Sequence, residues 1–169
     1  VWARPGNAAI APQELLDRVK RDGTSLLLLK SAESWMDVVS ENTGSSYHGY
    51  YSVGRNWIGG IHFVKDHPLF KELPVNCAMG WPYQELVRDG DRRLGMYMDN
   101  EELVVGSYRS TPFHLGTAVG IVSCGKGKVY YSTLDLIDHL NEPSGSSEVA
   151  RKLFCNFIEV AVNGNCTHP

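Results

Sequence analysis

The clearest pattern of hydrophobic and polar positions lies between residues 115 and 138. Apolar residues dominate positions 118–122, the segment Gly125–Gly127 interrupts them, and a β-branched and aromatic run resumes at 129–131. Glycine reaches the positive φ that tight hairpin turns need. The pattern therefore predicts an antiparallel hairpin. A strand as apolar as its first arm is typically covered on both faces, which favours a sheet inside a layered α/β domain.

Helical spacing marks two further segments. Residues 12–22 begin with a proline, which suits the first turn of a helix, and are followed by Gly23, which suits its end. Residues 146–162 repeat apolar positions at helical spacing over about four turns, which predicts a helix packed on the sheet. A third helix is expected from Trp35 onwards.

Strands are predicted at several other places. Four consecutive leucines at 26–29 predict a central strand, and Val1–Ala3 is expected to be the tail of an earlier one. A strand, helix and strand in this order indicate a parallel unit. Further strands are expected at 57–64, 95–98 and 103–108, a proline-bounded turn at 67–74, and a polar loop at 42–51.

Composition narrows the class of protein. The chain has 169 residues, 43% of them hydrophobic, and a net charge of -3 without a cluster of Lys or Arg, so we expect no nucleic-acid partner. No apolar run approaches the roughly 20 residues that span a bilayer, so no membrane partner is expected. The four cysteines lack the spacing of a metal site, and two of them are expected to be core residues. Residues 1–169 are predicted to form a single α/β domain, and the start at Val1 suggests a fragment of a larger chain.

The loop after the leucine strand is the first place to search for chemistry, because ligands in open α/β sheets bind beyond the carboxyl ends of strands. A nucleophilic serine at a strand-to-helix bend usually has glycine neighbours, as in GxSxG. Ser31 lacks such neighbours, and the segment 30–35 contains no cysteine. The alternative interpretation is that Ser31 or Ser34 caps the following helix.

Other candidate sites depend on weaker patterns. A Cys–His pair would need Cys77 or Cys124, and a glycosidase pair would need two facing carboxylates. No HxH or HExxH motif places two histidines on one helix face, so no metal is expected. Gly125–Lys128 is followed by a strand, so it does not form a phosphate-binding helix terminus. Aromatic residues could stack on sugar rings, and the candidates are Trp2, Trp35, Trp57, Trp81, Tyr47, Tyr50 and Tyr51.

Three segments carry a resemblance to a known family. They are HPLFKELP at 67–74, WPY at 81–83, and GIV followed by GKGKVYYSTLDL between 120 and 136, and the last expected helix also fits, with Ala150–Leu153 and Asn156. They resemble class I glutamine amidotransferase-like domains of the trehalose-utilisation type, which occur in bacterial glycoside hydrolases such as family-two β-galactosidases. The resemblance covers roughly residues 12–162. It implies a three-layer, flavodoxin-like sheet with flanking helices and the antiparallel hairpin near its C-terminal end.

The same resemblance fails at the catalytic residues. Enzymatic members carry a cysteine in the strand-to-helix bend, followed later by a histidine and a glutamate. Here the matching bend is Ser31–Ser34, and no His-x-Glu pair follows Tyr131. The resemblance thus implies the fold and a place beside a carbohydrate-active catalytic domain, and it does not imply glutaminase chemistry.

Three hypotheses follow for function. The first is a non-catalytic accessory domain of a glycoside hydrolase that supports domain packing, oligomerisation or substrate access. It needs no cofactor, its partners are the other domains and carbohydrate, and the resemblance implies a periplasmic or secreted location. The second is a small hydrolase that uses Ser31 or Glu33 with His62 or His114, in a pocket that includes Trp35. The third is a sugar-binding module.

Overall fold

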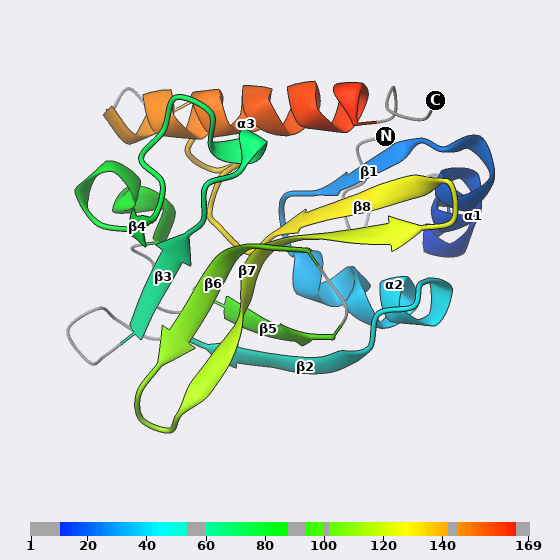
Figure 1. The fold of residues 1–169 in the computed structure, drawn as a ribbon, viewed down its shortest axis with the longest axis horizontal. Helices are drawn as coiled ribbons and strands as arrows, with labels where there is room; N and C mark the ends of the chain where they lie inside the picture. The colour runs from blue at the N-terminus through cyan, green and yellow to red at the C-terminus, as the bar shows by residue number, and fades with distance from the viewer. Residues whose placement is uncertain (1–10, 54–59, 88–93, 100–101, 142–144, 165–169) are drawn as a thin grey trace.

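A computed structural model describes residues 11–53, 60–87, 94–99, 102–141 and 145–164. This part of the chain forms a mixed α/β fold with three helices and an open eight-stranded sheet (Figure 1). The helices are α1 (Pro12–Asp22), α2 (Met36–Asn42) and α3 (Gly145–Asn163). The strands are β1 (Ser25–Leu28), β2 (Tyr47–Ser52), β3 (Gly60–Val64), β4 (Cys77–Ala78), β5 (Leu94–Met98), β6 (Glu102–Arg109), β7 (His114–Cys124) and β8 (Gly127–Ser132).

The sheet has the order β1-β8-β7-β6-β3-β4, and β5 links β7 to β2. β1 and β8 run parallel, with Leu27 opposite Tyr130, and the other pairs of described strands are antiparallel. The prediction of an α/β fold is confirmed. The finer prediction of a flavodoxin-like sheet is not confirmed, because the described strand pairs other than β1–β8 are antiparallel, whereas such a sheet is built of parallel strands.

The predicted hairpin is present as β7 and β8. Their register pairs Val119 with Ser132 and Cys124 with Gly127, and Gly125 adopts the left-handed φ of 61° in the turn. An added Cβ at Gly125 would also lie 2.7 Å from the Cα atom of Lys20, so glycine lets α1 approach the turn closely.

A β-bulge divides β7 into two parts. Val105 and Gly106 are adjacent on β6, yet they pair with Val119 and Thr117, so Ala118 is an extra residue in β7. A bulge of this kind reverses the alternation of side chains along a strand. Side chains of β7 before Ala118 therefore point to the opposite face of the sheet from the one that uninterrupted alternation along the strand would give them.

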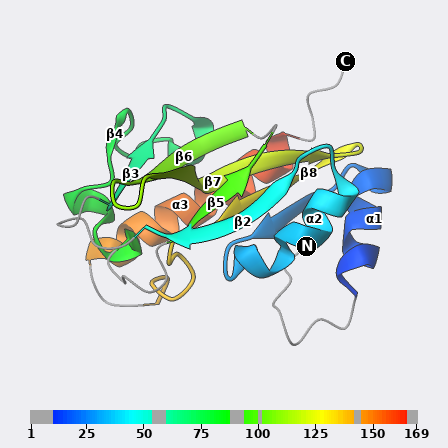
Figure 2. The same ribbon diagram turned by 90° about the horizontal axis from the view of Figure 1, so that it is seen from below.

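Helices cover both faces of the β1-β8-β7 part of the sheet. One face packs against α1 and α2 through a cluster that includes Leu16, Met36, Leu26, Val129 and Tyr131. The other face packs against α3, and Figure 2 shows the strands in front of that helix. The apolar stripe of α1 predicted from Leu15, Leu16 and Val19 is confirmed, since all three are buried.

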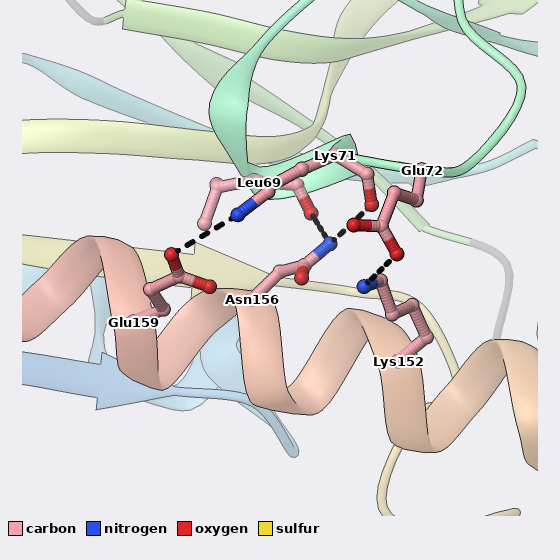
Figure 3. Close-up of polar contacts among 6 residues, drawn as sticks. All are labelled: Leu69, Lys71, Glu72, Lys152, Asn156 and Glu159. Atoms are coloured by element: carbon pink, nitrogen blue, oxygen red, sulfur yellow. Dashed lines mark hydrogen bonds and ion pairs between the residues drawn. The ribbon is translucent and has the colours of Figure 1, made fainter.

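Buried polar contacts attach α3 to the turn after β3. The Asn156 side chain, 2% exposed, donates hydrogen bonds of 3.0 Å to the carbonyl oxygens of Leu69 and Lys71 (Figure 3). Two surface ion pairs flank it, with Lys152 2.5 Å from Glu72 and Lys71 3.4 Å from Glu159. The predicted proline-bounded turn is present as a 3₁₀ turn at Pro68–Phe70.

Three expectations need comment. Of Cys124 and Cys155, the two cysteines expected in the core, Cys124 is buried, but Cys155 is exposed on α3, so the expectation is wrong for Cys155. The polar loop expected at 42–51 was wrong from Tyr47 onwards, because β2 pairs there with β5, and Tyr51 is buried between strands. The strand expected at Val1–Ala3 lies outside the described residues. Among the helices that the structure describes, none combines the length and the apolar character needed to cross a membrane.

Candidate functional site

A cavity of about 370 Å³ opens beyond the carboxyl ends of the parallel strands β1 and β8. The segment after β1 supplies Ser31 and Glu33, and the segment after β8 supplies Thr133 and Asp135. Tyr50 of β2 also lines it. We call this site the β1–β8 cavity. Its position agrees with the rule that open α/β sheets bind ligands at the carboxyl ends of their strands.

Ser31 makes the bend between β1 and the following 3₁₀ turn. It adopts the left-handed conformation with φ 52° and ψ 41°, which is uncommon for a residue with a Cβ. Its carbonyl oxygen accepts hydrogen bonds from the backbone nitrogen and hydroxyl of Ser34, at 3.2 and 2.7 Å. The Ser31 hydroxyl makes no capping hydrogen bond to the turn, and the side chain is exposed. The prediction that Ser31 or Ser34 caps the following helix is therefore wrong: Ser34 donates its hydroxyl to the carbonyl of Ser31, and the N-cap of α2 is Trp35, which makes no side-chain capping hydrogen bond.

The charged side chains around the β1–β8 cavity differ in whether they lie close to a group of opposite charge. Lys30 forms an ion pair with Asp138, and the Nε2 atom of His139 lies 3.6 Å from the Asp135 carboxylate. Glu33 is half-buried and makes no hydrogen bond or ion pair with any residue in the described ranges. It is therefore the carboxylate of this cavity that is available to a ligand.

Tyr50 places an aromatic ring at the rim. Its side chain is 56% exposed, and it lies on β2, the strand that also carries Tyr47. Burial raises the pKa of Tyr47 to about 12, and the charges of Asp37 and Glu33 contribute to the same shift. Tyr47 thus stays protonated at neutral pH, and the Glu33 carboxylate lies close enough to β2 to influence it.

The other predicted site residues do not line the β1–β8 cavity. Trp35 is 4% exposed and belongs to the core beneath α1 and α2. His62 is 2% exposed on β3, opposite Ser107 of β6. His114 begins β7 and lies in a separate aromatic cluster. The structure therefore brings Ser31 and Glu33 together and leaves the two histidines elsewhere.

The cluster around His114 is built on Tyr51. The two rings stack with centroids 4.6 Å apart, and the His114 Nδ1 atom forms a hydrogen bond with the Tyr97 hydroxyl. The Tyr51 hydroxyl lies 3.0 Å from both the carbonyl oxygen and the hydroxyl of Ser107. Burial raises the pKa of Tyr51, so its hydroxyl keeps its proton and remains a hydrogen-bonding group of this cluster between β2 and β6.

Sequence reasoning missed Asp138, and it named Tyr50 only as an aromatic residue that could stack on sugar and Lys30 only as part of the loop after the leucine strand. Asp138 reaches the cavity because β8 pairs in parallel with β1, so the segments after both strands leave the sheet at the same edge. The sequence signal was the polar stretch directly after the second hairpin strand. It could be used only once the partner of β1 was known. No group of three or more His, Cys, Asp or Glu side chains in the described part of the chain could hold a metal ion.

A second surface lies on the sheet face opposite α3, beyond the region that α1 and α2 cover. Ile61, Tyr108 and Leu115 occupy directly paired positions on β3, β6 and β7, and Phe63 lies in the next row, opposite Gly106. Ile61, Phe63 and Leu115 are 44%, 48% and 59% exposed. We call this surface the open sheet face. It is hollowed by a shallow groove of about 490 Å³.

Neither a protein-family model nor a curated protein matches this sequence. The functional proposals below therefore depend on the β1–β8 cavity and the open sheet face.

Proposed function

We propose that this chain is a non-catalytic accessory domain of a carbohydrate-active glycoside hydrolase, and that its open sheet face packs against a neighbouring domain of that enzyme. The resemblance to amidotransferase-like domains suggests the parent enzyme. The three-layer arrangement of helices around the β1-β8-β7 part of the sheet supports the amidotransferase-like class, although most strand pairs are antiparallel.

The observation that carries this proposal is the apolar character of the open sheet face. Antiparallel sheets that face water normally alternate apolar and polar residues, so that the solvent side is polar. Here Ile61 and Phe63 of β3 and Leu115 of β7 are exposed on the solvent side, with β6 and its Tyr108 between them. Clustered exposed apolar side chains of this kind mark interaction surfaces more often than isolated ones do.

The absence of catalysis is supported by the separation of the predicted residues. A hydrolytic serine needs a general base within hydrogen-bond reach, at roughly 2.6–3.2 Å. Ser31 lines the β1–β8 cavity, whereas His62 is buried on β3 and His114 bonds to Tyr97. His139, the histidine nearest in sequence to the segment after β8, interacts with Asp135.

Limited proteolysis of the full-length enzyme tests the packing. Replacing Phe63 and Leu115 together by lysine places two charges on the open sheet face, and we expect faster cleavage at the domain boundary. The matched control replaces Ile158 and Val162 by lysine, because these exposed apolar residues lie on α3. Equal cleavage rates for the two double variants would contradict a role for the open sheet face.

A small hydrolase is the second candidate, and one observation favours it: Ser31 and Glu33 do line the same cavity. The test is turnover of chromogenic galactosides and of glutamine by the 169-residue chain. The accessory-domain proposal expects no turnover above buffer. Turnover that Ser31→Ala or Glu33→Gln abolishes would establish the hydrolase instead.

A further inference from the structure

We infer that the β1–β8 cavity binds a neutral, hydroxyl-rich small molecule of the size of a single sugar ring. This site lies beyond the carboxyl ends of β1 and β8, whereas the packing proposal concerns the open sheet face. The two proposals can therefore fail separately.

The size and the shape of the cavity permit such a ligand. Its volume of about 370 Å³ lies within the range of roughly 300–1,000 Å³ that is typical of small-molecule sites. Apolar side chains such as Leu29 and Leu134 line it together with the hydroxyls of Ser31 and Thr133. A mixed lining of this kind suits a ligand that has both C–H faces and hydroxyl groups.

The charges disfavour an anion. Among the described residues, those that line the cavity include the carboxylates of Glu33, Asp135 and Asp138 and one lysine, Lys30, which already pairs with Asp138. A phosphate or a carboxylate ligand would meet uncompensated negative charge. Nucleotides and other phosphorylated molecules are therefore poor candidates.

The free polar groups suit a sugar. Glu33 has no hydrogen-bond or ion-pair partner among the described residues, and an ionised carboxylate can accept hydrogen bonds from two neighbouring hydroxyls of one ring. The Tyr50 ring, 56% exposed on the rim, offers a flat apolar surface beside it. Stacking on an aromatic ring together with a carboxylate acceptor would orient a pyranose.

A cation is the main competing ligand, because the carboxylates outnumber the lysine. The contacts that Asp138 and Asp135 already make argue against a cation. Asp138 is already neutralised by Lys30, and Asp135 lies beside His139, so Glu33 remains as one carboxylate next to an aromatic and apolar wall. A polyamine would need several carboxylates free at once.

Amide chemical shifts of the 169-residue chain, followed while methyl β-galactoside or methyl α-glucoside is added, test the inference. We expect shifts confined to the segments 30–35 and 132–138, and no such shifts with inorganic phosphate. Glu33→Gln should weaken glycoside binding about tenfold, because it replaces a charge-assisted hydrogen bond by a neutral one. Glu41→Gln on α2 is the matched control and should leave binding unchanged.

A second pair of variants separates stacking from folding. Tyr50→Phe retains the ring and should bind about as well as the original chain, whereas Tyr50→Ala should lose at least roughly tenfold. Absence of glycoside shifts in the cavity segments would overturn the inference, and so would binding that Glu33→Gln and Tyr50→Ala leave intact. Tighter binding of spermidine or phosphate than of either glycoside would also overturn it.

Discussion

Strand β3 shows the contrast between the two faces of the sheet most directly. His62 and Val64 point to the side that α3 and the turn segments cover, and they are 2% and 0% exposed. Ile61 and Phe63 point to the open sheet face, and they are 44% and 48% exposed. The strand is thus apolar on its solvent side, although none of the helices in the described part of the chain lies over that side.

The difference in exposure separates residues that stabilise the fold from residues that are available to contact a partner. Burial of an apolar side chain stabilises the fold in proportion to the area removed from water. Residues beneath α3 already contribute in this way, whereas those on the open sheet face contribute little until a partner covers them. The following predictions test this division, beginning with the largest expected effect.

Phe157→Ala and Phe63→Ala compare the same substitution on the two faces. Phe157 of α3 is fully buried, so its truncation should lower the free energy of unfolding by about 3–5 kcal/mol. Phe63→Ala should change it by no more than about 0.5 kcal/mol in the separate chain. Urea denaturation monitored by circular dichroism measures both. Similar losses for the two variants would refute the division.

Asn156→Ala tests the polar attachment of α3. Truncation leaves the carbonyl oxygens of Leu69 and Lys71 without their donor in a buried position, so we expect a loss of about 2–3 kcal/mol. Lys152→Ala removes the neighbouring exposed ion pair with Glu72 and should lose less than about 1 kcal/mol. The same denaturation experiment applies, and a larger loss for Lys152→Ala would be the contrary result.

Gly120→Ala tests how tightly β7 packs against β8. An added Cβ would lie 2.4 Å from the hydroxyl of Tyr131, which is fully buried and cannot move freely. We expect a loss of about 1–3 kcal/mol from overpacking. Gly44→Ala is the control, because an added Cβ at Gly44 would meet open space. This variant should change the free energy of unfolding by no more than about 0.5 kcal/mol. A neutral Gly120→Ala would show that the sheet relaxes there.

Acidification should destabilise the covered side through His67. Burial lowers the pKa of His67 below its ordinary value of 6.5, and Glu102, 3.3 Å away, offsets only part of this effect. The unfolded chain therefore takes up a proton at a higher pH than the folded chain does. The contribution of His67 to stability is fully present above about pH 6.5 and falls as the pH drops below it.

The variant His67→Asn isolates this small effect. The Nδ1 atom of His67 accepts a hydrogen bond from the backbone nitrogen of Leu69, and an asparagine oxygen can accept it instead. Thermal unfolding between about pH 7.5 and pH 5.5 should show a shallower decline for the variant. An unchanged slope would mean that His67 does not couple protonation to folding.

Much of the local structure could be predicted from the sequence. The periodic apolar positions of α1 and α3 and the glycine turn between β7 and β8 are local signals, and the structure confirms them. β2 was missed because its glycine and polar residues suggest a loop, and its stability comes from pairing with β5 and from the buried ring of Tyr51.

The candidate site could be predicted only in part. The position of Ser31 and Glu33 follows from the end of a buried strand, which is a local feature. The contribution of Asp138 depends on the pairing of β1 with β8, which no periodicity reveals. His62 and His114 were expected near Ser31. The sheet order places β6 and β7 between β8 and the strand of His62, and His114 begins β7 ahead of Val119, where the pairing with β8 starts.

The pairing of β1 with β8 also has a consequence for biosynthesis. Ser25–Leu28 of β1 pairs with Lys128–Tyr131 of β8, which lies about a hundred residues later in the chain. Strand β1 therefore leaves the ribosome long before β8 has been synthesised. Non-local pairing of this kind slows folding and leaves apolar segments unprotected in the meantime. The four consecutive leucines at 26–29 therefore emerge before the strand that covers their edge, and they stay without this partner until the hairpin has been synthesised.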